Sequence, residues 1–320
     1  MKIAIVKLSA LGDIIHAMVV LQYIKKAFPH IVIDWFVDAR FEQILHNNPH
    51  INQVYALGLK NQKKNYHSLY KSLKALAIQN QYDCIIDLQG LIKSALITKT
   101  LGVNTVGFDR KSAREPLAAL FYRQKCKIAY EKNVIMRNLE LVCQALHFPI
   151  PNLQTKEPFL LSNRKSNLKP ELLIITGSSW KSKVYPKEKF VEVINALSVE
   201  TYVSWGNKQE EENALFICEH TNAKILPALD LDTLKSIVSN SSLVIGADSG
   251  PTHMAWGLNR PSITIFGPTP SKRNTLETTI NKTIDCKKEI NPKKLNKKDP
   301  CIASIPPQEI VKMAKELLAC

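Results

Sequence analysis

The residues best suited to chemistry lie in three short polar turns, each of which follows an apolar run. The first turn is SALGD, residues 9–13, where Gly12 permits a tight backbone. Asp13 is either a cap of the helix that follows or a general base that accepts a proton from a hydroxyl group. The dinucleotide signature GxGxxG is absent here, so this turn gives no support to a nicotinamide enzyme.

The second turn is TGSS, residues 176–179, and Lys183 follows it closely. The hydroxyl groups of Ser178 and Ser179, backbone amides and a lysine ammonium can together hold a diphosphate without a metal ion. An ordinary loop with a surface lysine explains the pattern equally well. The turn is not a P-loop, because the motif GxxxxGK[ST] is missing.

The third turn is DSGPTH, residues 248–253. Ser249 and Gly250 open a helical pattern, and the free amides at a helix N-terminus attract an anion. Asp248 can accept hydrogen bonds from sugar hydroxyls, whereas a histidine such as His253, taken alone, is more often a capping or packing group. No acid pair of the DxD type stands near these turns, so we expect no metal ion and no other cofactor.

The elements that must position these turns are strands that alternate with helices. Apolar strand patterns include KIAIVKLS, IVIDWFVD, QVYAL and YDCIIDLQG in the first half, and ELLIITGSS, TYVSWGN, LVIGA and PSITIFGPT in the second. Helical spacing follows several of them, as in DIIHAMVVLQYIKKAF. This alternation predicts two doubly wound, Rossmann-like α/β domains with parallel sheets. Ligands bind such folds at the carboxyl ends of the strands, so we expect the two domains to face each other across a shared cleft.

The domain boundaries follow from composition. A segment rich in Pro, Asn and Ser predicts a linker over residues 156–170, between a domain at 1–155 and a domain at 171–300. The last stretch, 301–320, is predicted to be a helix that packs back on the N-terminal domain. No uninterrupted apolar run reaches the roughly 18 to 20 residues of a membrane-spanning helix, and no secretion signal is visible at the N-terminus.

Charge is distributed unevenly along the chain. The formal net charge is +15, and residues 1–150 hold 20 Lys and Arg against 10 Asp and Glu. Most of the remaining excess lies in residues 281–298, which read most simply as a solvated loop and, less simply, as a contact for anionic lipid. The N-terminal half therefore needs an anionic partner or surface. Nucleic acid is one such partner, but no nucleic-acid-binding module is recognisable, so we expect none to be bound. Seven cysteines without a CxxC pair favour a reducing cytoplasm.

Several of these segments together resemble a known family over nearly the whole chain. The runs VKLSALGDIIH, TGSSWKSKVYP, SWGNKQEEE and VIGADSGPTHMAWGLNRPSITIFGPT resemble the ADP-heptose:lipopolysaccharide heptosyltransferases, which have the GT-B fold. The runs YDCIIDLQGLIKSAL and KSAREPLAALFYRQK are similar to the member that adds the first heptose to a Kdo residue of Kdo2-lipid A. The alternative within the family is the member that acts next, on heptosyl-Kdo2-lipid A.

The resemblance implies an inverting glycosyltransferase with a C-terminal donor domain and a basic N-terminal acceptor domain. Its partners would be ADP-L-glycero-D-manno-heptose, Kdo2-lipid A and the anionic inner-membrane surface, with the enzyme cytoplasmic and peripheral on that membrane. By the same resemblance Asp13 is the general base, and Lys183 both binds the donor and stabilises the leaving group. The implied donor contacts are Ser178, Ser179 and Lys183 for the diphosphate, Glu210 for ribose, Leu229 for adenine, and Asp248, Ser249, Gly250 and His253 around heptose and diphosphate.

Candidates for the acceptor side are Gly12 and six basic residues: Lys60, Lys63, Lys64, Lys93, Lys111 and Arg114. Each of these cations alone is more often a solvated surface charge, and only Lys93 and Arg114 lie in matching motifs. The chain departs from the family pattern by having Ser178 and Ser179 where Thr is usual, Leu229 where Met is familiar, and Pro251 where Leu is common. These departures bear on the adenine contacts more than on the chemistry.

Overall fold

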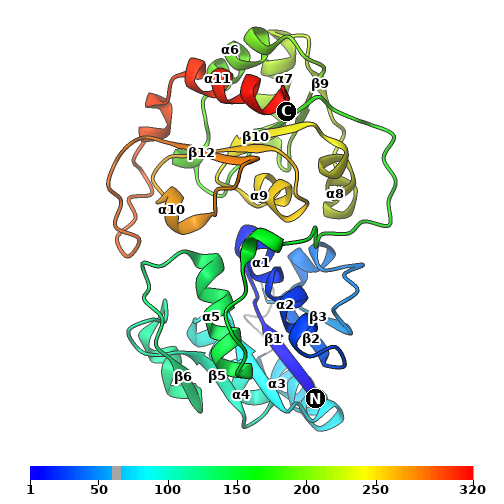
Figure 1. Ribbon diagram of the computed structural model, residues 1–320, viewed down its shortest axis with the longest axis vertical. Helices are drawn as coiled ribbons and strands as arrows, with labels where there is room; N and C mark the ends of the chain where they lie inside the picture. Colours follow the sequence, from blue (N-terminus) through cyan, green and yellow to red (C-terminus); the bar gives the residue numbers. More distant parts are fainter. Residues whose placement is uncertain (60–65, 320) are drawn as a thin grey trace. The chain divides into compact units, whose positions relative to one another are not determined.

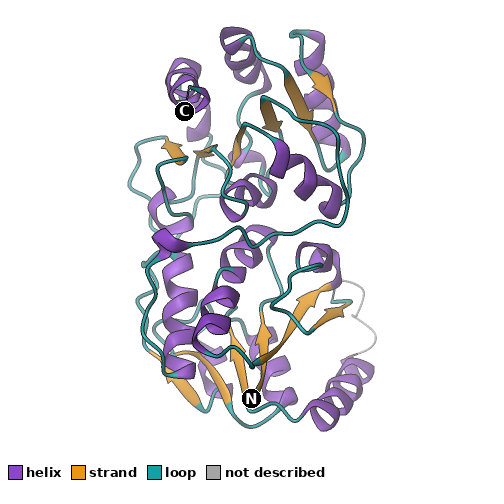
Figure 2. Ribbon diagram, turned by 45° about the vertical axis from the view of Figure 1, so that its right-hand side comes forward, coloured by secondary structure: helices purple, strands orange, loops and turns teal. Residues whose placement is uncertain are grey.

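A computed structural model describes residues 1–59 and 66–319 of the protein. The chain forms two compact units, Met1–Phe159 and Leu160–Cys320 (Figure 1). Each unit consists of one parallel sheet covered by helices, as Figure 2 shows. The α/β class predicted from the sequence, with two doubly wound sheets, is thereby confirmed.

The sheet of the first unit has the strand order β3-β2-β1-β4-β5-β6, with every pair parallel. Its strands are β1 (Lys2–Val6), β2 (Val32–Asp38), β3 (Gln53–Leu57), β4 (Cys84–Asp87), β5 (Thr105–Phe108) and β6 (Gln124–Cys126). One group of helices is α1 (Leu11–Met18), α2 (Val20–Ala27) and α5 (Val134–Leu146); the other is α3 (Tyr66–Asn80), α4 (Ile92–Leu101) and the 3₁₀ helix η3 (Pro116–Phe121). Helices α1 and α2 pack on α5, and α4 packs on α3 and η3. Right-handed crossovers place the two groups on opposite faces of the sheet.

The second unit repeats this plan. Its sheet runs β12-β11-β10-β7-β8-β9, again all parallel. Its strands are β7 (Leu172–Ile175), β8 (Thr201–Ser204), β9 (Lys224–Ile225), β10 (Leu243–Ala247), β11 (Ser262–Phe266) and β12 (Asn281–Asp285). Its helices are α6 (Lys187–Leu197), α7 (Lys208–Glu219), α8 (Leu231–Asn240), α9 (Gly250–Gly257), α10 (Ser271–Asn274) and α11 (Pro307–Leu318), with short 3₁₀ helices η5 (Lys181–Lys183) and η6 (Cys301–Ser304).

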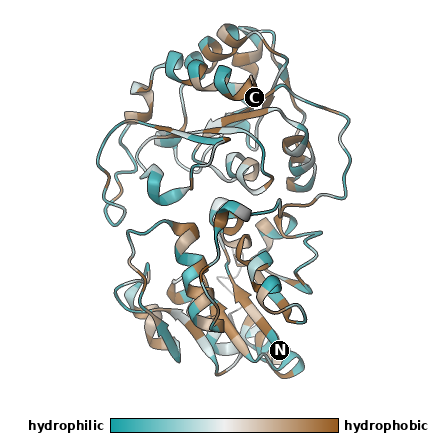
Figure 3. Ribbon diagram, in the orientation of Figure 1, coloured by the Kyte–Doolittle hydropathy of each residue, from teal (hydrophilic) through white to brown (hydrophobic). Residues whose placement is uncertain are grey.

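Both sheets therefore have the strand order 3-2-1-4-5-6 when the strands of each unit are numbered along the chain. The central strands are buried on both faces, which is why they read as continuous apolar runs rather than as alternating patterns. Figure 3 shows hydrophobic residues, in brown, along these strands. In such an order the connections after strands 1 and 4 run in opposite directions. The loops at these two strand ends therefore diverge and leave room for a ligand.

Two expectations need correction. The helical pattern after β1 forms two helices, α1 and α2, which meet at Val19. The run 281–298 is not wholly a loop, because its first residues form β12, which extends the sheet beside β11. The C-terminal helix α11 belongs to the second unit, and its predicted packing on the first unit stays a prediction. Ile310, Ala314 and Leu317 enter the core of the second unit, where α11 lies on α6, because this amphipathic helix has its apolar stripe facing that sheet.

The segment proposed as a linker, 156–170, contains no helix or strand. On the side of the first unit, the Asn48 side chain donates a hydrogen bond to the Phe159 carbonyl (2.9 Å). On the side of the second unit, Lys235 donates to the Leu161 carbonyl (2.6 Å). The domain limits 1–155 and 171–300 remain predictions, since this segment is attached to both units. No helix within residues 1–59 and 66–319 is long and apolar enough to cross a bilayer.

Candidate functional site

Each of the three polar turns follows a central strand, at the point of its sheet where the strand order reverses. Residues 9–13 follow β1, next to the turn that follows β4. The turns that begin at Thr176 and Asp248 follow β7 and β10, which are neighbours in the second sheet. The predicted residues of the donor side thus share one edge of the second unit, and those of the acceptor side that the structure describes share one edge of the first.

Asp248 is the centre of the arrangement in the second unit. Its carboxylate forms an ion pair with the Lys183 ammonium (Oδ2–Nζ 2.8 Å) and a hydrogen bond with the His253 ring (Oδ1–Nε2 2.9 Å). The Thr269 hydroxyl donates a third contact to Oδ2 (2.8 Å). All four side chains are buried. The structure therefore brings together Lys183, Asp248 and His253, as predicted, and adds Thr269, which sequence reasoning had missed.

Two opposing effects act on the ionisation of Asp248. Burial disfavours the charged carboxylate, but the Lys183 charge and the hydrogen bond from His253 outweigh it, so the pKa of Asp248 lies below its usual value. The carboxylate is therefore ionised and already satisfied by protein groups. Its clearest task is to hold Lys183 and His253 in place.

The other residues of these turns are tied to the same centre. Ser178 donates its hydroxyl to the backbone carbonyl of Asp248 (2.9 Å), which joins the turn after β7 to the turn after β10. Ser249 is the N-cap of α9, and its hydroxyl lies 3.0 Å from that of Thr252. Gly250 opens this helix. The amides at the start of α9 are thus available at the same edge as Lys183.

Glu210 stands at the edge of this cluster. Its carboxylate accepts hydrogen bonds from the Gly206 amide (2.8 Å) and the Asn207 side chain (2.6 Å). It also covers Gly177 so closely that a Cβ atom there would lie 2.2 Å from the Glu210 Cδ. Burial raises the pKa of Glu210, although the two hydrogen bonds oppose that change. Ser179 is exposed and Leu229 is half-buried just before α8, and neither contacts the Asp248 group through a hydrogen bond or ion pair in the described residues.

The Lys-rich run reaches this cluster, which its sequence did not predict. The Lys297 ammonium lies 4.8 Å from the centroid of the Trp180 ring, and the Lys183 ammonium lies 5.4 Å from the same ring. The Lys297 carbonyl also accepts a hydrogen bond from Ser182 (2.8 Å). Part of the run is therefore held against η5, which carries Lys183.

Asp13 lies in the first turn of α1, in the first unit. The N-cap of this helix is Ala10, so the interpretation of Asp13 as the cap residue is not supported. The Asp13 side chain is half-buried and makes no hydrogen bond or ion pair among the described residues. Gly12 precedes it in the same turn. The carboxylate is thus held on a rigid element while its oxygens stay available for a ligand.

Lys7 and Gln89 fasten the turn that carries Asp13 to the turn after β4. The buried Lys7 ammonium donates to the Leu88 carbonyl (2.9 Å), and Gln89 Oε1 accepts from the amides of Leu8 (3.1 Å) and Ser9 (3.2 Å). Burial lowers the pKa of Lys7, and the nearby carboxylate of Asp13 opposes that change. A lysine at the end of the apolar run KIAIV was a signal that could have identified Lys7 from the sequence.

The three basic candidates that the structure describes lie near the carboxyl ends of strands in the first unit. Lys93 is in the first turn of α4, and exposed Arg114 follows Ala113, whose Cα lies near Gly90 in the turn after β4. Lys111 is exposed in the turn after β5. Lys60, Lys63 and Lys64 lie outside the described residues.

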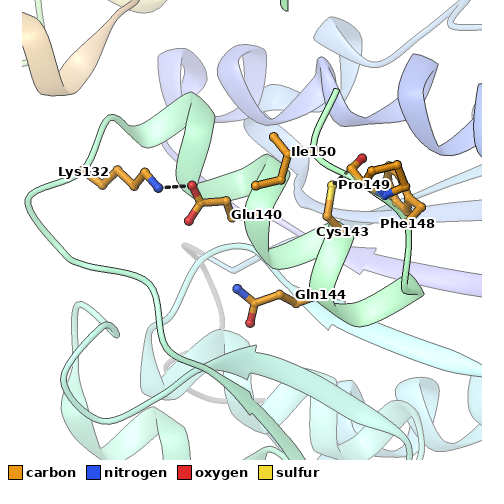
Figure 4. A pocket seen from close by; sticks show the side chains of 7 residues that line it. All are labelled: Lys132, Glu140, Cys143, Gln144, Phe148, Pro149 and Ile150. Carbon is orange, nitrogen blue, oxygen red and sulfur yellow. Dashed lines mark hydrogen bonds and ion pairs between the residues drawn. The ribbon is translucent and has the colours of Figure 1, made fainter. Parts of the chain in front are cut away.

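Two other kinds of site, metal-binding groups and surface pockets, were sought in the described part of the chain. Residues 1–59 and 66–319 contain no group of three His, Cys, Asp or Glu residues that could hold a metal ion. A surface pocket of about 390 Å³ opens on α5, between the Lys132–Glu140 ion pair and Ile150 (Figure 4). None of the predicted site residues lines it.

Comparison with known proteins identifies the class. Residues 66–304 match the model of glycosyltransferase family 9 (heptosyltransferase). Together with the close relative described next, this match shows that the chain belongs to that family.

Within the family, the chain is 43% identical to lipopolysaccharide heptosyltransferase 1 of Campylobacter coli, over 99% of both proteins. Its fold is similar to that of the Escherichia coli heptosyltransferase WaaC with ADP (TM-score 0.85, 26% identity, covering 99% of this chain and 100% of that one). It is also similar to WaaC with ADP-2-deoxy-2-fluoro heptose (TM-score 0.82, 27% identity, 99% of each chain).

These findings confirm the predicted family, the GT-B fold and the enzyme class. The protein is a glycosyltransferase, a heptosyltransferase of lipopolysaccharide synthesis. The basic charge had also suggested a nucleic-acid-binding protein. Membership of an enzyme family removes the reason for that suggestion. The full-length similarity to heptosyltransferase 1 favours the first of the two heptose additions over the second.

Proposed function

We propose that the protein transfers heptose from ADP-L-glycero-D-manno-heptose to a Kdo residue of Kdo2-lipid A, with inversion at the anomeric carbon. The observation that carries this proposal is the buried Lys183–Asp248–His253 group beside the N-terminus of α9. It lies in a chain 43% identical to a lipopolysaccharide heptosyltransferase 1. A similar solved structure holds ADP, and another holds an ADP-heptose analogue.

On the donor side, Lys183 and the amides of Ser249 and Gly250 bind the diphosphate of ADP-heptose. A fixed ammonium and free helix amides suit this task, because both are set before charge develops on the leaving group. Asp248 holds the ammonium through the 2.8 Å ion pair, and Thr269 orients the carboxylate. Ser178 and Ser179 add hydroxyl contacts to the diphosphate, Glu210 accepts hydrogen bonds from the ribose, and Leu229 packs against adenine. His253 and Asp248 border the heptose.

In the reaction, Asp13 accepts the proton of an acceptor hydroxyl. The hydroxyl oxygen forms a bond to the anomeric carbon on the face opposite ADP, while the bond from that carbon to the diphosphate oxygen breaks. ADP leaves with the electron pair of that bond, and Lys183 stabilises its charge. A base without a competing hydrogen-bond partner suits the first step, and the half-buried Asp13 carboxylate meets that condition among the described residues.

On the acceptor side, Lys93, Lys111 and Arg114 are proposed to bind anionic groups of Kdo2-lipid A next to Gly12. Lys60, Lys63 and Lys64 keep the same proposed role, outside the described residues. Because the acceptor is a membrane lipid, the enzyme would work in the cytoplasm, at the anionic inner face of the inner membrane. The excess of ten basic residues within 1–150 supports this location.

The test is product analysis with purified protein, ADP-heptose and Kdo2-lipid A in detergent. A product heavier by one heptose, with the new bond inverted relative to the donor, is the expected result. A second reaction with heptosyl-Kdo2-lipid A separates the two family members. Transfer to that acceptor alone would replace the proposal by the later addition step.

Metal removal supplies a prediction about the same reaction. Lys183 and helix amides supply the positive charge that a metal ion would otherwise supply, so turnover should be unchanged by EDTA. Initial rates are measured with and without the chelator and after addition of Mg²⁺. Loss of turnover in EDTA with recovery in Mg²⁺ would show that the leaving group needs a cation that the protein does not provide.

A further inference from the structure

An unusual concentration of exposed apolar side chains lies on one helical layer of the first unit. Of the eleven large apolar side chains that are exposed in the described part of the chain, five lie on α3, α4 and η3. The most exposed are Ile78 (75%), Leu120 (74%) and Leu117 (56%). The others are Tyr70 on α3 and Leu96 on α4. Exposed apolar residues that gather in this way mark a contact surface rather than chance exposure.

These side chains belong to one continuous layer. Helix α4 packs on both α3 and η3, and the buried residues Ala95, Ala118 and Tyr122 join α4 to η3. On α3, Tyr70, Lys74 and Ile78 recur at a spacing of four residues, which puts them on one face of the helix. We call this surface the α3–α4–η3 face.

The charge of the face has a single sign. Residues 66–80, 92–101 and 116–121 contain four lysines and no Asp or Glu. Lys71, Lys74 and Lys99 are exposed, and the Lys74 ammonium lies 5.8 Å from the Tyr70 ring centroid. Lysines surrounded by exposed apolar side chains can place their stems among lipid chains and their ammonium groups among phosphates.

The alternative occupant, another protein, fits this composition less well. Lysine is depleted in the buried centre of protein interfaces, whereas both lysine and leucine are favoured where a helix lies in the headgroup region of an anionic bilayer. Lys93, a proposed acceptor contact, lies in the first turn of α4, the helix that also exposes Leu96. A bilayer on this face would therefore lie close to the proposed acceptor site.

We infer that the α3–α4–η3 face is the surface by which this enzyme docks on an anionic bilayer, with Leu117 and Leu120 inserting among the lipids and the lysines meeting the phosphates. This inference rests on the proposed function in one respect, since it supposes an acceptor that is embedded in the membrane. It goes beyond it by assigning the residues that make the contact.

The experiment measures binding of the full chain to vesicles of phosphatidylglycerol and phosphatidylcholine, and to vesicles of phosphatidylcholine alone. One variant pair removes apolar contacts, Leu117→Ser with Leu120→Ser, and its matched control changes two exposed leucines of the second unit, Leu161→Ser with Leu215→Ser. A second pair removes charge, Lys71→Gln with Lys99→Gln, and its control is Lys294→Gln with Lys298→Gln. Melting temperatures verify that every variant is folded.

The wild type should bind only the anionic vesicles, and each pair on the face should weaken binding by about tenfold or more. Salt should reduce the effect of the lysine pair, because screening acts on charge, while the effect of the leucine pair should persist. The inference is overturned if the wild type ignores anionic vesicles, if it binds neutral ones equally, or if the control pairs weaken binding as much. Heptose transfer in detergent is assayed in parallel. Transfer without vesicle binding refutes the docking face alone, and vesicle binding without transfer refutes the proposed reaction alone.

Discussion

Asp248 shows how one buried charge can hold several polar side chains in place. Its three partners, Lys183, His253 and Thr269, come from three different segments of the second unit. Removing one partner of a buried ion pair costs about 3–5 kcal/mol of folding free energy, since the other charge stays buried and unpaired. The position of Lys183 therefore depends on Asp248 and, through it, on Thr269.

This dependence predicts how stability varies with pH. The folded-state pKa of Asp248 lies below the unfolded value of 3.8, so its contribution is fully present above about pH 3.8 and is lost as pH falls toward the folded-state pKa. Asp248→Asn should lower the free energy of unfolding by about 3–5 kcal/mol at pH 7 and by less in acid. Urea midpoints of wild type and variant between pH 7 and pH 3 test this. A difference that stays constant over that range would mean that the carboxylate is not ionised in the folded protein.

Asp13 is a second example at the scale of the residue. Its proposed role depends on a carboxylate that is available to a ligand, rather than on one held in an ion pair. Asp13→Asn should slow turnover by about 10²–10⁴-fold, which is what loss of a general base typically costs. ADP affinity should not change, and stability should fall by no more than about 1 kcal/mol, because an acid in the first turn of a helix contributes only that much. The comparison uses kcat, the Kd for ADP and the melting temperature. Nearly full turnover in a folded variant would leave Asp13 with a purely structural role.

At the scale of elements, the three polar turns could be picked out from the sequence, whereas the residues that hold the turns in place could not. The signals SALGD, TGSS and DSGPTH are local, because each reports a strand end and a helix start. Lys7, Gln89 and Thr269 act across the fold, and only strand order tells which turn each one meets. The alternation of strands and helices likewise predicted the class of fold. The short strands β5, β6 and β9 were missed because two to four residues carry too little pattern.

The partner of helix α11 and the contact of the Lys-rich run could not be predicted for a related reason. An amphipathic stripe says that α11 must cover an apolar surface but not which one, and in this fold α6 supplies it. The charge of the Lys-rich run says that it is solvated, yet Trp180, far away in sequence, attracts Lys297. Interactions between segments that are distant in the sequence therefore could not be predicted from the sequence.

The contact between Lys297 and Trp180 leads to a prediction about this loop. Because Lys297 and Lys183 lie over the same indole ring, a diphosphate bound by one lies within the field of the other. Lys297→Ala should weaken ADP binding by about fivefold, the value of one partly screened charge of roughly 1 kcal/mol. Its exposed neighbour offers a control, since Lys298→Ala should leave ADP affinity unchanged. Titration calorimetry at low salt compares the two. Equal effects would assign the loss to the net charge of the loop.

At the scale of the whole molecule, the two units repeat one plan while their charge differs. Each sheet has the same strand order, and each unit has its own buried core. The basic excess is concentrated in the first unit, to which we assign the anionic acceptor. Two separate cores of this kind are what independently folding domains require.

Independence of the second unit can be tested directly. A fragment comprising residues 160–320 keeps the whole sheet and the hydrogen bonds of Lys235 and Ser236 that hold the first residues of that unit against α8. It should unfold cooperatively and bind ADP with a Kd within about tenfold of the full chain, because every proposed donor contact lies within it. Circular dichroism and calorimetry measure both. An unfolded fragment would contradict independent folding of the second unit. A folded fragment that does not bind ADP would place part of the donor site in the first unit.

The close approach of Glu210 to Gly177 also limits how this sequence can change over generations. Any side chain at position 177 would displace the Glu210 carboxylate from the Gly206 amide and the Asn207 side chain, because a Cβ atom there falls 2.2 Å from its Cδ. The carboxylate is the far end of a flexible side chain, so it can turn aside and the change at 177 need not disrupt the turn. What the change removes is the bridge from Glu210 to Gly206 and Asn207. Over generations, position 177 is therefore free to vary only in lineages that can do without this placement of Glu210.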